Sequence, residues 1–267
     1  MPEHETMEIT AAVELLADWI YESQRMVVFT GAGVSTESGI PDFRSPGGIW
    51  SKYDPRELTF QRFLADPEVR KLRWKMFMEN AAMWEAKPNP AHLACAELFR
   101  LGKLRAVITQ NIDGLHQDAG VPAEKVVELH GTNRWVYCLE CGARWPSEEI
   151  RQRIEEENLE IPDCTECGGI LKTATISFGE PMPEKEMRAA EQLSREADLM
   201  LVIGSTLVVY PAAYMPQITK EAGGKVAIIN LSESGGDHYA DLIIRGKAGE
   251  LMSLVLETYK KKYATGE

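Results

Sequence analysis

Apolar residues follow two alternating patterns along most of this chain. Short runs rich in β-branched residues predict buried strands, and they lie at residues 26–30, 105–110, 126–131, 173–178, 198–206, 225–231 and 241–246. Apolar positions at helical spacing predict helices between them, at residues 10–23, through much of the stretch to about residue 86, at 183–196, at 212–222 and after 246. Strands that alternate with helices predict an α/β fold with a doubly wound parallel sheet.

One segment, residues 134–171, interrupts this rhythm. It contains two CxxC pairs with a charged stretch between them, so we interpret it as an inserted small module. The large domain is then formed by residues 1–133 and 172–267, with a helical segment at 45–90. Within that segment, Asp66-Pro67 is a favourable start for a helix.

Length and charge restrict the function classes. A chain of 267 residues suits one α/β domain with a small insertion. The net charge of −12 disfavours nucleic-acid binding and favours basic partners such as lysine-rich tails. There is no run of eighteen apolar residues and no basic-then-apolar leader, so we expect neither a membrane span nor a signal peptide.

The cysteines indicate a metal site. Both CxxC pairs lie in a chain that lacks secretion signals, which favours metal binding in a reducing compartment and a cytoplasmic location. Four thiolates close a tetrahedral zinc site without an open position, so the zinc is expected to be structural. Two redox-active CxxC pairs are the alternative, although Gly142 and Gly168 favour metal-binding turns. The ligands are Cys138, Cys141, Cys164 and Cys167, whereas Cys95 is expected in the core.

A glycine-bearing turn, Gly31-Ala32-Gly33, follows the first predicted strand directly. Such a turn lets the backbone approach a diphosphate, and a following helix N-terminus favours its charge. The third position of the GxGxxG pattern is Thr36, so the turn alone could equally be an ordinary tight turn. Similarly, Asn111-Ile112-Asp113 by itself favours an Asx-type turn after a strand.

Longer sequence blocks resemble the sirtuin family, in its bacterial and archaeal form. GAGVSTESGIPDFRS (31–45) closely resembles the sirtuin signature GAGxSxxxGIPDFR. The other blocks follow in the family's order across nearly the whole chain: TQNIDGLH (109–116), His130-Gly131, the two CxxC pairs, SFGE (177–180), GST (204–206) and IIN (228–230).

This resemblance implies a Rossmann-like large domain, a small zinc module, and a cleft where the co-substrate NAD⁺ meets an acetyl-lysine protein. The implied activity is NAD⁺-dependent protein-lysine deacetylation that yields nicotinamide, O-acetyl-ADP-ribose and free lysine, with nicotinamide as a product inhibitor. A sirtuin acting mainly as a mono-ADP-ribosyltransferase, or a non-catalytic NAD- or zinc-binding module, is the alternative.

The resemblance also implies the NAD⁺ contacts. The diphosphate and the ribose beside it would contact Gly31, Ala32, Gly33, Thr36, Asp42 and Arg44, and Gln110 would bind the ribose on the nicotinamide side. Ser35, Asn111, Ile112 and Asp113 would shape the nicotinamide pocket, while Phe43 would cover the reactive ribose carbon. Gly204, Ser205, Thr206, Asn230, Leu231 and Ala248 would hold the adenosine half.

Two residues are assigned to catalysis. His130 would be the general base that takes a proton from a ribose hydroxyl, because imidazole titrates near neutrality. Asn111 would supply an oriented polar group beside it. A hydrogen-bonded structural histidine is the alternative for His130. His116 is expected to be buried and structural, and His4, His92 and His238 receive no role.

The SFGE block is expected to be a strand edge to which the substrate peptide adds as a strand, with selectivity that depends little on peptide sequence. Its contacts would be Phe178, Gly179, Glu180 and Val209. The family's Pro-x-Val-Val before this block is replaced here by residues 173–176, TATI. Trp74 and Phe77 occupy the positions of the Tyr-x-x-Arg pair of desuccinylating relatives, so we expect an apolar acyl pocket that favours acetyl over succinyl. The string at Tyr53 and Arg56 is discounted, because it lies in a stretch that deacetylases share.

Overall fold

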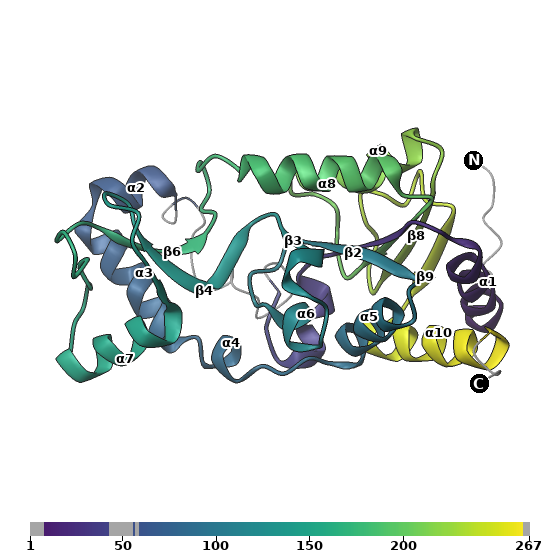
Figure 1. Cartoon of the computed structure of the whole chain (residues 1–267), viewed down its shortest axis with the longest axis horizontal. Helices are drawn as coiled ribbons and strands as arrows, with labels where there is room; N and C mark the ends of the chain where they lie inside the picture. Colours follow the sequence, from purple (N-terminus) through teal and green to yellow (C-terminus); the bar gives the residue numbers. More distant parts are fainter. Residues whose placement is uncertain (1–7, 43–55, 57–58, 264–267) are drawn as a thin grey trace.

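The computed structural model describes residues 8–42, 56 and 59–263, and a parallel sheet of six strands organises it (Figure 1). The order across the sheet is β3-β2-β1-β7-β8-β9. Because β2 and β7 flank β1, the chain reverses its winding direction there, as in Rossmann-like folds. The strands are β1 (Met26–Thr30), β2 (Leu104–Thr109), β3 (Val126–Glu128), β7 (Leu199–Ile203), β8 (Lys225–Asn230) and β9 (Leu242–Arg245).

Helices cover both faces of this sheet, which explains why β1 and β7 are buried along their whole length. One face carries α8 (Glu184–Glu196) and α9 (Tyr214–Glu221), and the other carries α1 (Ile9–Glu22), α5 (Pro90–Arg100) and α10 (Ala248–Tyr263) (Figure 1). Shorter elements are α6 (Leu115–Asp118) and the 3-10 helix η5 (Ala123–Lys125). Within the described residues, every helix is too short or too polar to cross a bilayer.

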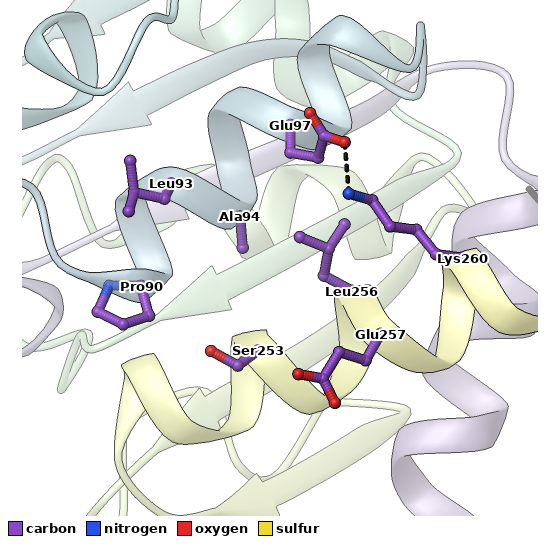
Figure 2. A pocket seen from close by; sticks show the side chains of 8 residues that line it. All are labelled: Pro90, Leu93, Ala94, Glu97, Ser253, Leu256, Glu257 and Lys260. Carbon is purple, nitrogen blue, oxygen red and sulfur yellow. Dashed lines mark ion pairs between the residues drawn. The ribbon is translucent and has the colours of Figure 1, made fainter.

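A groove runs between α5 and α10. Figure 2 shows Lys260 reaching across it to Glu97, with 2.5 Å between the charged atoms. The groove has a volume of about 380 Å³, and none of the predicted site residues lines it. It therefore belongs to the packing of two helices and not to the candidate chemistry.

The small module contains a second, antiparallel sheet with the order β5-β4-β6. Its elements are β4 (Gly131–Cys138), β5 (Arg144–Pro146), α7 (Ser147–Glu157) and β6 (Leu171–Thr175). The prediction that residues 173–178 continue the large sheet is therefore wrong. The chain enters the module along β4 and leaves it along β6, and these two strands pair from Gly131↔Thr175 to Cys138↔Leu171. The small sheet consequently extends beyond the predicted 134–171 limits at both ends.

The helical segment packs on this small module. It forms α2 (Phe60–Ala65), α3 (Pro67–Glu79) and α4 (Ala81–Glu85). As predicted, α3 begins at Asp66-Pro67, and the Asp66 carboxylate accepts a hydrogen bond from Glu68 N at 3.0 Å. Trp74 and Phe77 on α3 share one buried core with Val136 and other residues of the module. The helical segment and the small module thus form one unit beside the large sheet (Figure 1).

Candidate active site

The loops that follow β1 and β7 touch through two glycines. Gly33 N donates a hydrogen bond to Gly204 O at 2.8 Å, and a Cβ on Gly33 would lie at the same distance from that oxygen. Gly204 has φ +63°, and a Cβ there would lie 2.2 Å from Val34 N. Side chains are therefore excluded from this contact. The bare backbone that results fits a dinucleotide loop at the switch point of the sheet.

The segment after the first glycine turn differs from the expectation. Two 3-10 helices, η1 (Ala32–Val34) and η2 (Thr36–Ser38), stand where an α-helix N-terminus was expected to favour the diphosphate. Thr36 Oγ1 turns back to Gly33 O at 3.0 Å, which tightens the first of these turns. Among the described residues of this loop, a diphosphate would meet backbone groups of short 3-10 turns and not the N-terminus of a long helix.

A buried polar chain connects the two loops that were predicted to bind nicotinamide. Asn111 Nδ2 donates to Ser35 Oγ at 3.0 Å, and Ser35 Oγ donates to Asp113 Oδ2 at 2.7 Å. The other Asp113 oxygen accepts from Leu115 N at 2.9 Å, so the Asx-type turn is also present. One carboxylate thus closes a turn and orients Ser35. The side chains form a fixed polar surface before any ligand arrives.

Two buried histidines lie next to these loops, one against Ser35 and the other against Thr30. His92 Nε2 lies 3.5 Å from Ser35 Oγ, and burial lowers the pKa of His92 to about 4. His116 Nε2 lies 3.0 Å from Thr30 Oγ1, and burial holds its pKa well below the usual value. Both rings are therefore neutral at pH 7. His116 is buried as predicted, whereas the sequence analysis missed His92 because its partner lies 57 residues away.

His130 lies between β3 and β4, at the boundary of the two sheets. Its Nδ1 lies 2.9 Å from Gln110 O, which makes Nδ1 the protonated nitrogen. The other ring nitrogen of His130, Nε2, has no hydrogen-bond partner among the described residues, so it keeps a free lone pair. Burial lowers the pKa of His130, and the bond to Gln110 opposes that shift only partly. A neutral imidazole with an available Nε2 is what a general base requires.

The predicted adenosine side gathers at the ends of β7 and β8. Gln110 Nε2 donates to Ser205 Oγ at 2.8 Å, which joins the predicted ribose contact to the β7 loop. Asn230 is buried at the end of β8, and the Leu231 side chain next to it is 72% exposed. Gly204, Ser205 and Thr206 follow β7, and Ala248 begins α10. Asp42 is half-buried, while Phe43 and Arg44 lie outside the described residues.

A contact that the sequence analysis missed ties the first loop to α10. The carboxylate of Glu37 accepts a hydrogen bond from Gly249 N at 2.6 Å, across 212 residues of sequence. A Cβ on Gly249 would lie 2.9 Å from that carboxylate. Glu37 therefore satisfies an otherwise unpaired N–H in the first turn of α10. No local sequence signal marks this pairing.

The SFGE block forms a turn instead of the regular strand edge that we expected. Glu180 N donates to Ser177 O at 3.0 Å, and Gly179 at φ +77° completes the turn. Only Phe178 pairs as a strand residue, through one parallel bridge to Thr59. Its side chain is 49% exposed, whereas Val209 is half-buried on the loop after β7.

The predicted metal ligands converge on one point. All four sulfur atoms lie within 4.8 Å of one another, with 3.5 Å between Cys138 and Cys167 and 3.6 Å between Cys141 and Cys164. A tetrahedral zinc with Zn–S bonds of about 2.3 Å places its sulfurs about 3.8 Å apart, so the set fits that ion. Gly142 and Gly168 both have φ +73°, as the tight turns after each pair require. The four cysteines are thus positioned to bind a structural zinc.

Comparison with known proteins identifies close relatives. The Sir2 family model matches residues 31–211. The NAD-dependent protein deacetylase 1 of Bradyrhizobium diazoefficiens is 46% identical over 246 residues, which cover 92% of this chain and 95% of the relative. A Sir2 histidine-to-alanine variant, solved with deacetylated p53 peptide and 3'-O-acetyl-ADP-ribose, is 40% identical with a TM-score of 0.85, covering 92% of this chain and 97% of its own. A Sir2 complex with p53 peptide and NAD⁺ gives 40% and 0.82, with 91% and 96% covered.

Zinc content tests the metal site. We expect about one zinc per chain, held by thiolates that contribute directly to folding. Cys141→Ala should lose the zinc and unfold or aggregate, whereas Cys95→Ala, which removes a buried thiol outside the cluster, should keep it. Elemental analysis and thermal unfolding of both variants measure this. Folded, active protein without zinc would contradict the assignment.

Proposed function

The chain belongs to the Sir2 family, and on that premise we propose that it is an NAD⁺-dependent protein-lysine deacetylase. The products would be nicotinamide, O-acetyl-ADP-ribose and the free lysine. The observation that carries the proposal is the position of His130. Its Nδ1 is held by the backbone oxygen of Gln110, the residue before Asn111. The backbone oxygen of His130 accepts a hydrogen bond from Ile176 N at 2.8 Å, which places it beside the predicted peptide site.

The Asn111–Ser35–Asp113 chain is suited to the nicotinamide pocket. Bound NAD⁺ would supply an electrophilic ribose carbon and hydroxyl groups that can accept the acetyl group. The polar atoms of these three residues are oriented in advance, with Ser35 and Asn111 buried and Asp113 half-buried, so they need little reorganisation when positive charge develops nearby. In this assignment Asp113 orients the carboxamide through its acceptor oxygens, and Asn111 is a polar neighbour that does not act as a nucleophile.

His130 would act on the proton of a ribose hydroxyl. Gln110 O fixes the tautomer in which Nε2 carries the lone pair, and burial keeps the ring neutral before reaction. Accepting the proton makes the ring cationic, and the carbonyl of Gln110 then stabilises the positive charge through the Nδ1–H. The same contact therefore orients the base and supports its protonated form.

The peptide would enter beside Phe178 and add a strand through backbone hydrogen bonds. Such pairing recognises main-chain groups more than side chains, which supports a broad range of acetyl-lysine proteins as substrates. We also propose that nicotinamide inhibits as a product, since it would return to the Ser35–Asn111–Asp113 pocket. A cytoplasmic location is supported by the reduced state that four zinc-binding thiolates require.

Replacing His130 tests the proposed base. His130→Ala should lower kcat for an acetyl-lysine peptide by at least roughly a hundredfold, the usual loss for a general base. The affinity for NAD⁺ should change much less, because no step of binding needs that proton transfer. His238→Ala, an exposed histidine, is the matched control. Near-normal turnover in the first variant would remove His130 from the mechanism.

Nicotinamide release without lysine deacetylation by the wild type would favour ADP-ribosyl transfer.

The pH profile provides a separate measurement. The base must be neutral, and burial lowers the pKa of His130 below its ordinary 6.5. Activity should therefore be independent of pH just above neutrality and fall with acid only below pH 6.5. The measurement is kcat/KM for the peptide at saturating NAD⁺, with His238→Ala for comparison. An acid limb centred above pH 7 would contradict a base that is neutral at rest.

The acyl group is the third point to test. Trp74 and Phe77 are buried in the core under the small module, which supports an apolar pocket floor. The expectation of a wholly apolar pocket needs correction, because Trp74 Nε1 is a buried polar atom with no hydrogen-bond partner among the described residues. A buried succinyl carboxylate without a cationic partner should still cost about 3 kcal/mol.

We therefore expect kcat/KM for acetyl-lysine to exceed that for succinyl-lysine by at least roughly a hundredfold, about 2.7 kcal/mol. The two peptides should differ only in the acyl group and be compared at saturating NAD⁺, with a butyryl peptide expected to be tolerated. Equal or faster desuccinylation would contradict the prediction. Arg73, which precedes Trp74 and which the sequence argument did not consider, would then be the first residue to replace.

A further inference from the structure

A buried lysine lies behind the predicted peptide site, and the proposed chemistry does not use it. Lys172 on β6 is 1% exposed. Its Nζ lies 3.0 Å from Glu180 Oε2, and it also donates to the backbone oxygens of Thr173 and Thr175. All three of its N–H groups thus have acceptors. A charge in such a place is tolerated only with a partner of opposite sign and good geometry.

The partner carboxylate closes the SFGE turn. Glu180 Oε2 also accepts from Ser177 N at 2.8 Å, and Tyr137 Oη donates to the other oxygen at 3.3 Å. The side chain of Glu180 is 9% exposed, so it turns inward and away from the place where a peptide would lie. Arg73 provides a second cation, with its guanidinium 3.5 Å from Ser177 Oγ. The inner side of the turn is therefore a closed polar cluster.

The outer side of the same turn carries the groups expected to meet the substrate. The exposed Phe178 lies there, and its backbone oxygen accepts from Phe60 N at 2.9 Å. Gln61 Nε2 donates to Gly179 O at 3.0 Å. One residue before the turn, Ile176 N bonds His130 O. The Lys172–Glu180 pair is thus connected to the peptide edge through the backbone of the turn, and to the proposed base through the hydrogen bond from Ile176 N to His130 O.

We propose that Lys172 is a positioning residue: through Glu180 it holds the Ser177–Glu180 turn in the form that receives the acetyl-lysine peptide. The inference rests on the proposed function, because the peptide is that function's substrate. Without Lys172, the Glu180 carboxylate loses the cation it contacts and gains from reaching water. Moving it outward opens the bond to Ser177 N and displaces Phe178. Glu180 therefore acts on the peptide through the turn and not through direct contact.

The test compares peptide and NAD⁺ affinities in full-length, zinc-loaded protein. Lys172→Met should weaken binding of an acetyl-lysine peptide, followed by fluorescence anisotropy, by at least roughly tenfold, since one partner of a buried pair is lost. The KM for peptide should rise in parallel, while the KM for NAD⁺ stays within about threefold. Lys172→Arg, which keeps the charge, should recover most of the peptide affinity. Lys71→Met removes an exposed pair with Glu160 and is the matched control, expected to have no effect.

Unchanged peptide affinity in folded Lys172→Met would overturn the inference, and so would an equal loss of peptide and NAD⁺ binding, which indicates general damage. If Lys172→Met does not fold, Glu180→Gln decides, because the amide keeps an acceptor for Ser177 N but removes the charge. It should show the same selective loss of peptide affinity, and normal affinity would refute the role of the pair. A wild type that does not deacetylate refutes the proposed function, whereas an active wild type with unaffected variants refutes this inference alone.

Discussion

The backbone contact between Gly33 and Gly204 is the constraint on which the site depends. It exists because two parallel strands, β1 and β7, end side by side and both following loops lack a side chain at the point of contact. That approach places Ser35 on one loop and Ser205 on the other, within reach of the β2 loop, whose Asn111 and Gln110 bond to them. A methyl group at either glycine would push the β1 and β7 loops apart, so the placing of Ser35 and Ser205 around the β2 loop, and with it the polar chain and the proposed ribose contact, follows from this close approach.

His130 has a second dependence, on the junction between the two sheets. Gly131 next to it has φ +73° and no space for a Cβ, which would lie 2.0 Å from Ala174 O. The chain can therefore pass from the large sheet into β4 while β4 pairs closely with β6. As a result His130 bonds Gln110, which follows β2 of the large sheet, and Ile176, which follows β6 of the small sheet. The proposed base and the peptide edge are aligned by the same few backbone bonds, so their relative position does not rely on mobile side chains.

The sequence was sufficient for features with a local signature. The β-branched runs gave the six strands of the parallel sheet, the Asp66-Pro67 start gave α3, and the cysteine spacing gave the metal cluster. Features that depend on pairing between distant segments were not predictable. The run before SFGE, TATI, is rich in β-branched residues like the large-sheet strands, yet it pairs with β4 because the insertion must leave beside the strand by which it enters. The partners of His92, Glu37 and Lys172 are likewise set by tertiary packing, and these residues in isolation resemble surface or neutral positions.

The hydrogen bond from Gly249 N to Glu37 has a thermodynamic consequence. It joins the first turn of the C-terminal helix to the loop that follows β1, so the two segments share part of their free energy of opening. By linkage, a ligand that immobilises the loop protects the amides at the start of α10 from hydrogen exchange. Fraying of α10 in turn weakens the binding of that ligand by the same free energy. Helix α10 and the loop after β1 are therefore energetically coupled. A ligand bound at the loop changes the stability of α10 without any movement of the sheet between them.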